Sequence, residues 1–350
     1  MEKDKLELAI RTQPAPFCYM CGSAGVLLHE GIKDCFQDTG QSWSIKICSD
    51  ASCGLGWVEP MPMEEDIHKA YQAYYTHSDI GLNYSNRVVR LYKHIRAGYL
   101  AGKYGYYRDR VSLAQKLAGL AINFHPGRRA MIDAQIMEVP AGGSGSRLLE
   151  IGSGSGRTLE LLRELGWTTQ GVEQDPNAVR NCISKNLDVR QGTLFEQKYA
   201  SDSFDAVIMS HVIEHLHDPR ATLSEILRIL KPGGLLSMTA PNILCLGARH
   251  FGKAWLGWDP PRHIHNFSPG SIMTLVKSAG FSMANVKTTI NYANYNYMGS
   301  KDTLNGRKIR VMRWPVSERL AGMIYQMVMW AWLKFNKDIG DELIIMARKP

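Results

Sequence analysis

Short apolar runs alternate with helical patterns over most of the chain beyond residue 146. The run RLLEI (147–151) is followed by RTLELLRELG (157–166), whose apolar residues recur at helical spacing. Alternation of this kind predicts a parallel sheet with helices on both of its faces. Further strands are expected at 168–172, 187–192, 204–209, 234–240, 282–290 and 341–350, and further helices at 175–186 and 221–230.

The first 140 residues contain two other patterns. Residues 1–62 hold short apolar runs broken by cysteines and glycines, which is typical of small β-ribbons. Residues 63–140 have apolar positions at helical spacing, such as Tyr92, Ile95 and Tyr99, which predicts amphipathic helices. We therefore expect a ribbon module, a helical linker or cap, and an α/β domain over 141–350 with a helical insert near 300–338.

Composition places the chain among ordinary globular proteins. It has 350 residues, of which 45% are hydrophobic and 21% charged, and its formal net charge is +8. The start, MEKDKLELAIRTQ, mixes acidic and basic residues without an apolar core, so we do not expect a secretory signal. We therefore expect a cytoplasmic location, where the seven cysteines are thiols or metal ligands rather than disulfides.

A glycine loop follows the first strand of the α/β pattern. The segment GSGSG (152–156) allows a tight turn and lets a ligand approach the backbone at the start of a helix. The second strand ends at Glu173, and a carboxylate there is suited to bind both hydroxyls of a ribose. Nicotinamide enzymes and methyltransferases share this arrangement, so the loop alone does not separate them.

Four sequence blocks make that distinction. LLEIGSGSG, GVEQDP, FDAVIMSHVIEHLHDP and LKPGGLLSMTAPN, in this order, resemble the class I S-adenosylmethionine-dependent methyltransferases over about residues 140–290 and the last strand. The resemblance implies a Rossmann-like, mainly parallel sheet with an antiparallel last strand, and S-adenosylmethionine as methyl donor. It implies a donor site made of Glu150, Gly152, Ser153, Gly154, Gly156, Glu173, Gln174, Thr193, Ser210 and His211.

Individual roles follow from the same resemblance. The glycines are expected beside the methionyl and ribose parts of the donor, Glu150 near its amino group, and Gln174 near adenine. The family often has an aspartate after the third strand, whereas this chain has Gly192-Thr193-Leu194. Backbone groups near Thr193 are therefore expected to recognise adenine.

The segment PPRHIHNF (260–267) carries the candidate residues for proton removal from an acceptor. A histidine suits that role because its pKa lies near neutrality, and His263 and His265 share a face if the segment is extended. Alternatively, both hold the loop in place by hydrogen bonds. Arg262 is a candidate partner for an anionic acceptor, and Trp255 and Trp258 are expected to keep the site dry. Similar segments occur in methyltransferases of sugar and polysaccharide pathways.

The run His211-Val212-Ile213-Glu214-His215 also fits the H-x-x-E-H pattern of a group of zinc peptidases. That chemistry needs both histidines on one continuous helix. Here His211 ends an apolar strand and the helical pattern begins only near Arg220. We therefore expect no peptidase site.

Four cysteines have the arrangement of a structural zinc ribbon. Cys18 and Cys21 form one pair, and Cys48 and Cys53 form a second pair with four intervening residues instead of the usual two. Because of the unusual spacing, Cys35 or His29 is a candidate to replace one of the four cysteines as a zinc ligand. The alternative without metal is that the cysteines are buried and reduced. Some bacterial sugar and polysaccharide methyltransferases have a similar amino-terminal ribbon.

Two surfaces invite other interpretations. Residues 85–129 contain ten Lys or Arg and one Asp. This fits a solvated helical face, which we favour, docking of RNA, or attraction to the phosphates of a nucleotide-sugar or lipid-linked acceptor. Residues 320–333 are apolar but too short to span a membrane. They are expected to lie in the core; the alternatives are burial in a partner subunit and peripheral contact with a membrane surface.

Together these features predict a methyltransferase acting on a small molecule or a sugar or polysaccharide precursor. One alternative is an RNA or protein methyltransferase that docks through the basic region. The other is a non-catalytic scaffold that binds S-adenosylmethionine. The pattern indicates no oligomeric state.

Overall fold

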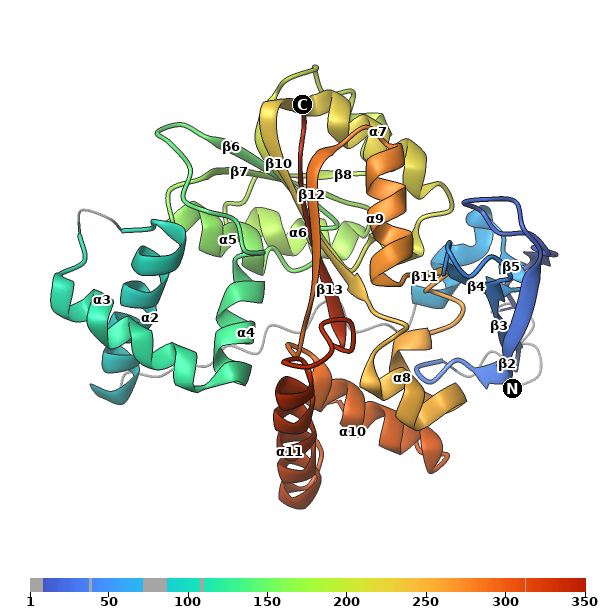
Figure 1. Ribbon diagram of the computed structural model, residues 1–350. Coiled ribbons are helices and arrows are strands. Elements are labelled where there is room, and N and C mark those ends of the chain that lie inside the picture. The colour runs from blue at the N-terminus through green and yellow to red at the C-terminus, as the bar shows by residue number, and fades with distance from the viewer. Residues whose placement is uncertain (1–8, 38–39, 72–86, 108–109, 312) are drawn as a thin grey trace. The chain divides into compact units, whose positions relative to one another are not determined.

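The computed structural model describes residues 9–37, 40–71, 87–107, 110–311 and 313–350 (Figure 1). The chain forms two compact units. The first comprises Met1–Tyr74, His211–Leu223 and Thr239–Ile345. The second comprises Tyr75–Ser210, Ser224–Met238 and Met346–Pro350.

The second unit contains the expected parallel strands. β6 (Arg147–Ile151) pairs in parallel with β7 (Thr168–Glu173) and β9 (Phe204–Ser210), and β7 pairs in parallel with β8 (Val189–Gln191). Helix α5 (Arg157–Glu164) follows β6. The full sheet has the order β12-β13-β10-β9-β6-β7-β8. The other strands of the sheet are β10 (Leu230–Pro241), β12 (Ser282–Thr289) and β13 (Glu342–Arg348). Helix α6 (Pro176–Ser184) follows β7, and helix α7 (Pro219–Ile229) follows β9.

Hydrogen bonds at both ends of β13 define its direction. Asn242 N–H donates to Asp341 O (3.1 Å) and Lys349 N–H donates to Gly234 O (3.0 Å). The start of β13 thus lies beside the end of β10, so the last strand is antiparallel, as expected. The fold is Rossmann-like, with a mixed sheet of mostly parallel strands.

The helical region before the sheet packs on the core of the second unit. The hydrophobic cluster includes Leu148 from β6 and Leu159 from α5, together with Leu100 and Ile132 from the helices before the sheet. Buried Asp133 accepts hydrogen bonds from the hydroxyls of Tyr99 and Tyr104, which compensates its burial. The helices are α2 (Arg87–Tyr104), α3 (Leu113–Gly119) and α4 (Pro126–Gln135).

The first unit contains the expected β-ribbons and one strand that the sequence pattern did not predict. β2 (Gly25–Lys33), β3 (Ser42–Cys48) and β4 (Gly56–Glu59) form an antiparallel sheet, and β11 (His265–Asn266) pairs with β4 at its edge. A two-residue strand has too little pattern to be recognised, and its pairing satisfies backbone groups that an edge strand would otherwise expose. A second small sheet pairs β1 (Thr12–Gln13) with β5 (Met61–Pro62).

Helices of the first unit are α8 (Leu246–Phe251), α9 (Pro269–Ser278), α10 (Ala293–Leu304) and α11 (Val316–Trp332). Helices α10 and α11 form the insert expected near 300–338 and contact each other. Trp255 and Trp258 lie in a buried cluster with Trp43 and Ile45, their own rings 5.0 Å apart. The short 3-10 helices of the chain are η1 (Glu64–Tyr71), η2 (Leu120–Phe124), η3 (Phe195–Gln197), η4 (Ile213–His215), η5 (Gly252–Ala254) and η6 (Leu256–Trp258).

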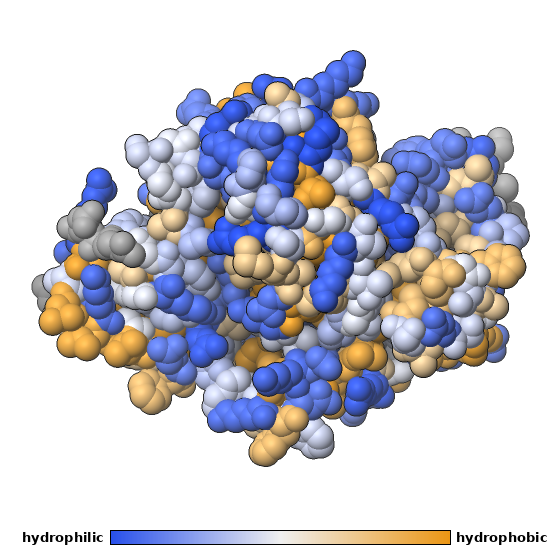
Figure 2. Space-filling model, turned by 45° about the horizontal axis from the view of Figure 1, so that its top comes forward, coloured by the Kyte–Doolittle hydropathy of each residue, from blue (hydrophilic) through white to orange (hydrophobic). Residues whose placement is uncertain are grey.

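Charged and apolar side chains are interspersed over much of the molecular surface shown in Figure 2. Hydrophobic side chains gather on the side where α3 lies in Figure 1. The exposed apolar residues of that region are Leu113, Leu117, Leu120 and Phe124. Among the described residues, we find no helix with the length and apolar character needed to cross a membrane.

Candidate functional site

The glycine loop adopts a backbone conformation that side chains disfavour. Gly152, Gly154 and Gly156 have φ values of +71°, +48° and +76°. A Cβ atom on Gly156 would lie 2.5 Å from Leu187 Cδ1 and 2.8 Å from Cys182 Sγ, whereas one on Gly154 would meet nothing within 4 Å. The loop is therefore closed at Gly156, where α5 begins, and open at Gly154, where a ligand can approach the backbone.

Glu173 holds this loop in place. Its Oε2 accepts a hydrogen bond from Gly154 N–H (2.8 Å), and its Oε1 accepts bonds from Gln174 N–H (2.8 Å) and Asp175 N–H (3.0 Å). A carboxylate has about four acceptor positions, so it can still accept a bond from a ribose hydroxyl. Glu173 thus connects the end of β7 to the glycine loop after β6.

Two buried polar side chains lie next to the loop. Glu150 is 3% exposed and Ser153 is 6% exposed, and neither Glu150 Oε2 nor Ser153 Oγ has a hydrogen-bond partner within the described residues. Burial raises the pKa of Glu150 to about 8. Unpaired buried oxygens are costly, and a ligand that carries an ammonium group and hydroxyls would satisfy them. The residues present therefore fit S-adenosylmethionine.

The remaining donor-site candidates are more peripheral. Gln174 is exposed, and Thr193 N–H and Oγ1 both contact Glu196 Oε2, at 2.6 and 3.1 Å. Ser210 ends β9 and is partly exposed. The adenine-binding role expected near Thr193 stays a prediction.

His211 belongs to the first unit, where two carboxylates flank its ring. Its Nδ1 lies 3.2 Å from Glu214 Oε1 and its Nε2 lies 2.7 Å from Glu342 Oε1. Burial acts to lower the pKa of His211, but its hydrogen bonds to both carboxylates outweigh that effect and raise the pKa well above the ordinary value. His211 is therefore an imidazolium, and both of its nitrogens are occupied.

Arg262 differs from the expectation that it meets an anionic acceptor. Its guanidinium is fully buried, and its five N–H groups donate to Asp34, Asp259 and the carbonyl of Ala70. No N–H group is left for an acceptor because all five are already used. Arg262 instead fixes the 259–263 segment to the residues around Asp34.

His263 and His265 lie in different surroundings despite their spacing of two. The ring centroid of His263 is 4.8 Å from that of His215, whereas His265 packs against Tyr19 at 5.1 Å. Burial lowers the pKa of both His263 and His265 to about 4, so both rings are neutral at pH 7. The backbone of His217 faces the ring of His265 and acts to raise its pKa, but burial outweighs this effect.

The H-x-x-E-H run does not form a peptidase site. It begins directly after β9 and ends in the single turn η4, so His211 and His215 do not share a continuous α-helix. Glu214 and His215 instead lie near His263, from a segment about fifty residues later. His215 was not among the expected site residues, and the H-x-x-E-H match was the one signal in the sequence that pointed to it.

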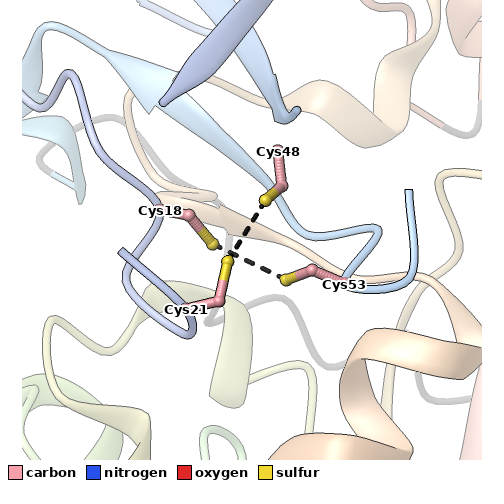
Figure 3. Close-up of side chains that lie close together, drawn as sticks. All are labelled: Cys18, Cys21, Cys48 and Cys53. Carbon is pink, nitrogen blue, oxygen red and sulfur yellow. Dashed lines mark hydrogen bonds between the residues drawn. The ribbon is translucent and has the colours of Figure 1, made fainter. Parts of the chain in front are cut away.

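The four ribbon cysteines come together (Figure 3). Cys18 Sγ lies 3.6 Å from Cys53 Sγ, and Cys21 Sγ lies 3.4 Å from Cys48 Sγ, and all four sulfurs are within 4.8 Å of one another. Tetrahedral zinc with bonds of about 2.3 Å separates its sulfurs by about 3.8 Å, so the arrangement fits zinc. Cys35 and His29 are not part of this cluster, and Cys35 lies near Asp34 and Asp259 instead.

Comparison with known proteins agrees with the glycine-loop site. Residues 125–286 match a family described as a methyltransferase domain. A ubiquinone biosynthesis O-methyltransferase from Cereibacter sphaeroides (strain ATCC 17025 / ATH 2.4.3) is 24% identical over 226 residues, which cover 61% of this chain and 78% of the relative. A probable S-adenosylmethionine-dependent methyltransferase from Mycolicibacterium smegmatis is 28% identical over 145 residues, which cover 40% of this chain and 53% of the relative.

A solved structure is also similar. The crystal structure of an S-adenosylmethionine-dependent methyltransferase from Archaeoglobus fulgidus is 19% identical, with a TM-score of 0.41, over 69% of this chain and 97% of that chain.

A Rossmann-like sheet with a glycine loop and a carboxylate at the tip of the second strand defines a domain that binds a nucleoside-containing ligand. The family match over these strands identifies it as a class I S-adenosylmethionine-dependent methyltransferase domain. The protein is thus an enzyme that uses S-adenosylmethionine as its methyl donor.

Proposed function

We propose that the enzyme methylates a hydroxyl group of a small molecule, with a sugar or polysaccharide precursor as the second candidate. The observation that carries the proposal is the first relative, which is named for O-methylation in ubiquinone biosynthesis and matches over 61% of this chain. The sugar candidate rests on the 260–267 segment and the cysteine ribbon. Docking of RNA or protein and a non-catalytic scaffold are the alternatives that the tests below separate.

The residues of the glycine loop bind and orient the donor. The open backbone at Gly154 admits it, Glu173 accepts a ribose hydroxyl, and the buried carboxyl of Glu150 pairs with its ammonium group. S-adenosylmethionine supplies an electrophilic methyl group, so the chain has mainly to align an acceptor and exclude water. A hydroxyl acceptor also loses its proton, and we assign its removal to His265, whose ring is neutral at pH 7.

Calorimetric titration of S-adenosylmethionine and S-adenosylhomocysteine tests the donor site. We expect micromolar binding by the wild type and none by Gly154→Arg, because the larger side chain fills the open approach to the loop. Gly145→Arg is the matched control, since Gly145 also has a positive φ and open surroundings but lies outside the loop. Absence of binding by the wild type would refute the donor site.

Turnover assays then separate the acceptor classes. S-adenosylhomocysteine release is measured with phenolic hydroxyl compounds, nucleotide sugars and RNA, each with wild type and His265→Gln. The proposal predicts turnover with phenols or sugars and a loss of at least tenfold in kcat, without loss of donor affinity, in the variant. Turnover with RNA alone, or binding without turnover on any acceptor, would support the alternatives instead.

We also propose that Cys18, Cys21, Cys48 and Cys53 bind one structural zinc ion. The support is that four sulfur atoms, three of them on buried residues, lie close together. Four thiolates complete a tetrahedral zinc site without a histidine or a water ligand. Zinc in such a site stabilises folding and takes no part in catalysis. Metal analysis of protein that has never met a chelator should give one zinc per chain, and Cys48→Ser should lower it. A clearly smaller content in the wild type would refute the proposal.

A third proposal concerns the exposed face of α11, which we infer contacts the surface of an anionic membrane. Leu320, Met323, Ile324 and Met327 are each 44% or more exposed along one helix. Exposed cations lie at both ends of this face, Arg313 and Arg319 before it and Lys334 and Lys337 after it. Apolar insertion flanked by cations complements an anionic lipid surface. A cytoplasmic enzyme that meets the inner membrane face in this way fits both the sequence and this surface.

A further inference from the structure

Glu214, His215 and His263 form a compact cluster in the first unit that the proposed donor and zinc sites do not use. One oxygen or nitrogen of each residue lies within 4.8 Å of those of the other two, and His263 Nε2 is 3.9 Å from Glu214 Oε1. Two imidazoles and one carboxylate are a set of ligands that divalent first-row metals favour. The cluster joins η4 to the segment 259–263.

Backbone carbonyls lie beside one nitrogen of each imidazole. His263 Nδ1 lies 2.8 Å from Gly257 O, and a carbonyl only accepts hydrogen bonds, so Nδ1 of His263 is the protonated nitrogen and its Nε2 keeps its lone pair. His215 Nδ1 lies 2.9 Å from both Arg262 O and Tyr71 Oη, and the tautomer that donates to Arg262 O leaves Nε2 of His215 free to bind a metal. Histidines that ligate metals typically donate their second nitrogen to a carbonyl or carboxylate in this way.

The carboxylate is prepared in a similar manner. Glu214 is 1% exposed, and its Oε1 lies 3.2 Å from Nδ1 of the imidazolium of His211. Its other oxygen, Oε2, is buried and has no hydrogen-bond partner within the described residues. A buried carboxylate oxygen without a partner is unfavourable, and a cation beside it would remove that penalty.

A neighbouring cluster provides the contrast. Asp34, Cys35 and Asp259 also lie within 4.8 Å of one another. There, the buried guanidinium of Arg262 already contacts both carboxylates and supplies the positive charge. Among the described ion pairs, Glu214 contacts no arginine or lysine; its charged partner is His211, which binds Oε1 and leaves Oε2 without a hydrogen-bond partner. The carbonyl of Arg262 also bonds His215, so the arginine positions one of the ligands.

We propose that Glu214, His215 and His263 bind one divalent first-row cation, such as Mn²⁺, Fe²⁺ or Zn²⁺. His215 is partly exposed, which gives the cation a route into the cluster. Metal bonds of about 2.0–2.2 Å require the three ligand atoms, which now lie within 4.8 Å of one another, to approach to about 3.0–3.4 Å. Three protein ligands leave coordination positions for oxygen atoms.

Binding of Mn²⁺ tests the site directly. Mn²⁺ prefers oxygen and nitrogen ligands to thiolates, so it distinguishes this cluster from the four cysteines. Purified full-length protein that retains its own metal is titrated with MnCl₂ and followed by electron paramagnetic resonance. We expect one bound Mn²⁺ per chain, with affinity lowered at least tenfold in Glu214→Gln and in His263→Gln. His265→Gln is the matched control, a buried histidine of the same segment outside the cluster, and should bind as the wild type does.

Two further measurements keep the test decisive if a variant folds poorly. Mn²⁺ should raise the Tm of the wild type, and Co²⁺ added to the wild type should give a visible spectrum without a thiolate charge-transfer band. Absence of Mn²⁺ and Co²⁺ binding by the wild type, or unchanged binding by a folded Glu214→Gln, would overturn the inference.

Titration with S-adenosylhomocysteine separates this inference from the proposed function. Donor binding without cation binding refutes the metal site and leaves the methyltransferase assignment intact. Cation binding without donor binding supports the metal site and refutes the donor site.

Discussion

Individual side chains in both units owe their protonation states to burial and to their nearest partners. Glu150 and His263 are buried, and burial favours their neutral forms. His211 is buried as well, yet the carboxylates of Glu214 and Glu342 keep it charged. Position in the fold therefore sets the charge of each group more than residue type does.

Replacement of Glu150 by Gln should affect stability and donor binding in opposite directions. The folded pKa of about 8 lies above the ordinary value of 4.5. The wild type therefore loses stability as the pH rises from about 4.5 to 8, because only the unfolded chain ionises freely. Glu150→Gln removes this loss. The free energy of unfolding of the variant relative to the wild type should therefore increase by on the order of 3 kcal/mol from pH 5 to pH 8, with a matching rise in its relative Tm.

Donor affinity of Glu150→Gln should fall at least tenfold, because the pairing with an ammonium group is lost. Scanning fluorimetry and calorimetric titration measure the two effects. Glu164→Gln, at an exposed position at the end of α5, is the control and should change neither. A Tm difference that does not depend on pH would contradict the buried neutral carboxyl.

Arg262 should contribute to stability rather than to acceptor binding. Arg262→Met leaves Asp34 and Asp259 buried without their cation, and loss of one partner of a buried ion pair costs about 3–5 kcal/mol. Urea unfolding measures the loss. Arg228→Met breaks a partly exposed pair with Glu225 and should cost less than about 1 kcal/mol. Comparable losses in the two variants would argue against the buried network.

At the scale of elements, the loop between β6 and α5 combines two different demands on glycine. Gly156 is needed because its φ is positive and Leu187 and Cys182 leave no room for a side chain. Gly154 has a positive φ too but borders open space. The first glycine serves the packing of the unit and the second serves access of the donor.

Alanine at these two positions should therefore have different consequences. Gly156→Ala combines backbone strain with steric overlap and should lower stability by about 3 kcal/mol or more. Gly154→Ala carries only the backbone term, about 1–2 kcal/mol, but should lower donor affinity at least tenfold. Thermal unfolding and calorimetric titration distinguish the two, with Gly145→Ala as the control for a positive φ elsewhere. Equal stability losses at 154 and 156 would contradict the packing argument.

The pairing of β11 with β4 is the element that changes the interpretation of the 260–267 segment. An extended run of residues was expected to direct His263 and His265 to one face. The strand covers only His265 and Asn266, and His263 lies before it, next to His215. Alternation of side chains applies only within a strand, so it did not extend to His263.

At the scale of the whole molecule, charge and apolar surface predict where the protein meets other surfaces. The double variant Ile324→Glu/Met327→Glu should abolish binding to phosphatidylglycerol vesicles at low salt, because it places carboxylates in the apolar face of α11. Binding by the wild type should weaken as salt rises, and vesicles of phosphatidylcholine should bind much less. Vesicle sedimentation measures each effect.

A second double variant, Leu113→Glu/Leu117→Glu, changes the exposed apolar face of α3 and should leave vesicle binding unchanged. Loss of binding in this variant instead would assign the contact to the second unit, whose helices carry many cations. No binding of the wild type to anionic vesicles at low salt would refute membrane contact.

The sequence by itself determined the parallel sheet, the glycine loop and the grouping of the four cysteines, while the methyl donor followed from the resemblance of four sequence blocks to a known family. These features depend on local information: the period of apolar residues sets each element, and a positive φ requires glycine within a few residues of the strand. The acidic residue at the end of β7 follows from the same pattern.

Only the tertiary structure decided which polar side chains meet. Arg262 pairs with Asp34, 228 residues away, and His263 joins Glu214 and His215 from a separate segment. No periodicity encodes such contacts, because they arise when distant segments pack and each buried charge or lone pair must find a partner. For that reason the donor-binding loop could be predicted from the sequence, whereas the pairing of Arg262 and the cluster around Glu214 could not.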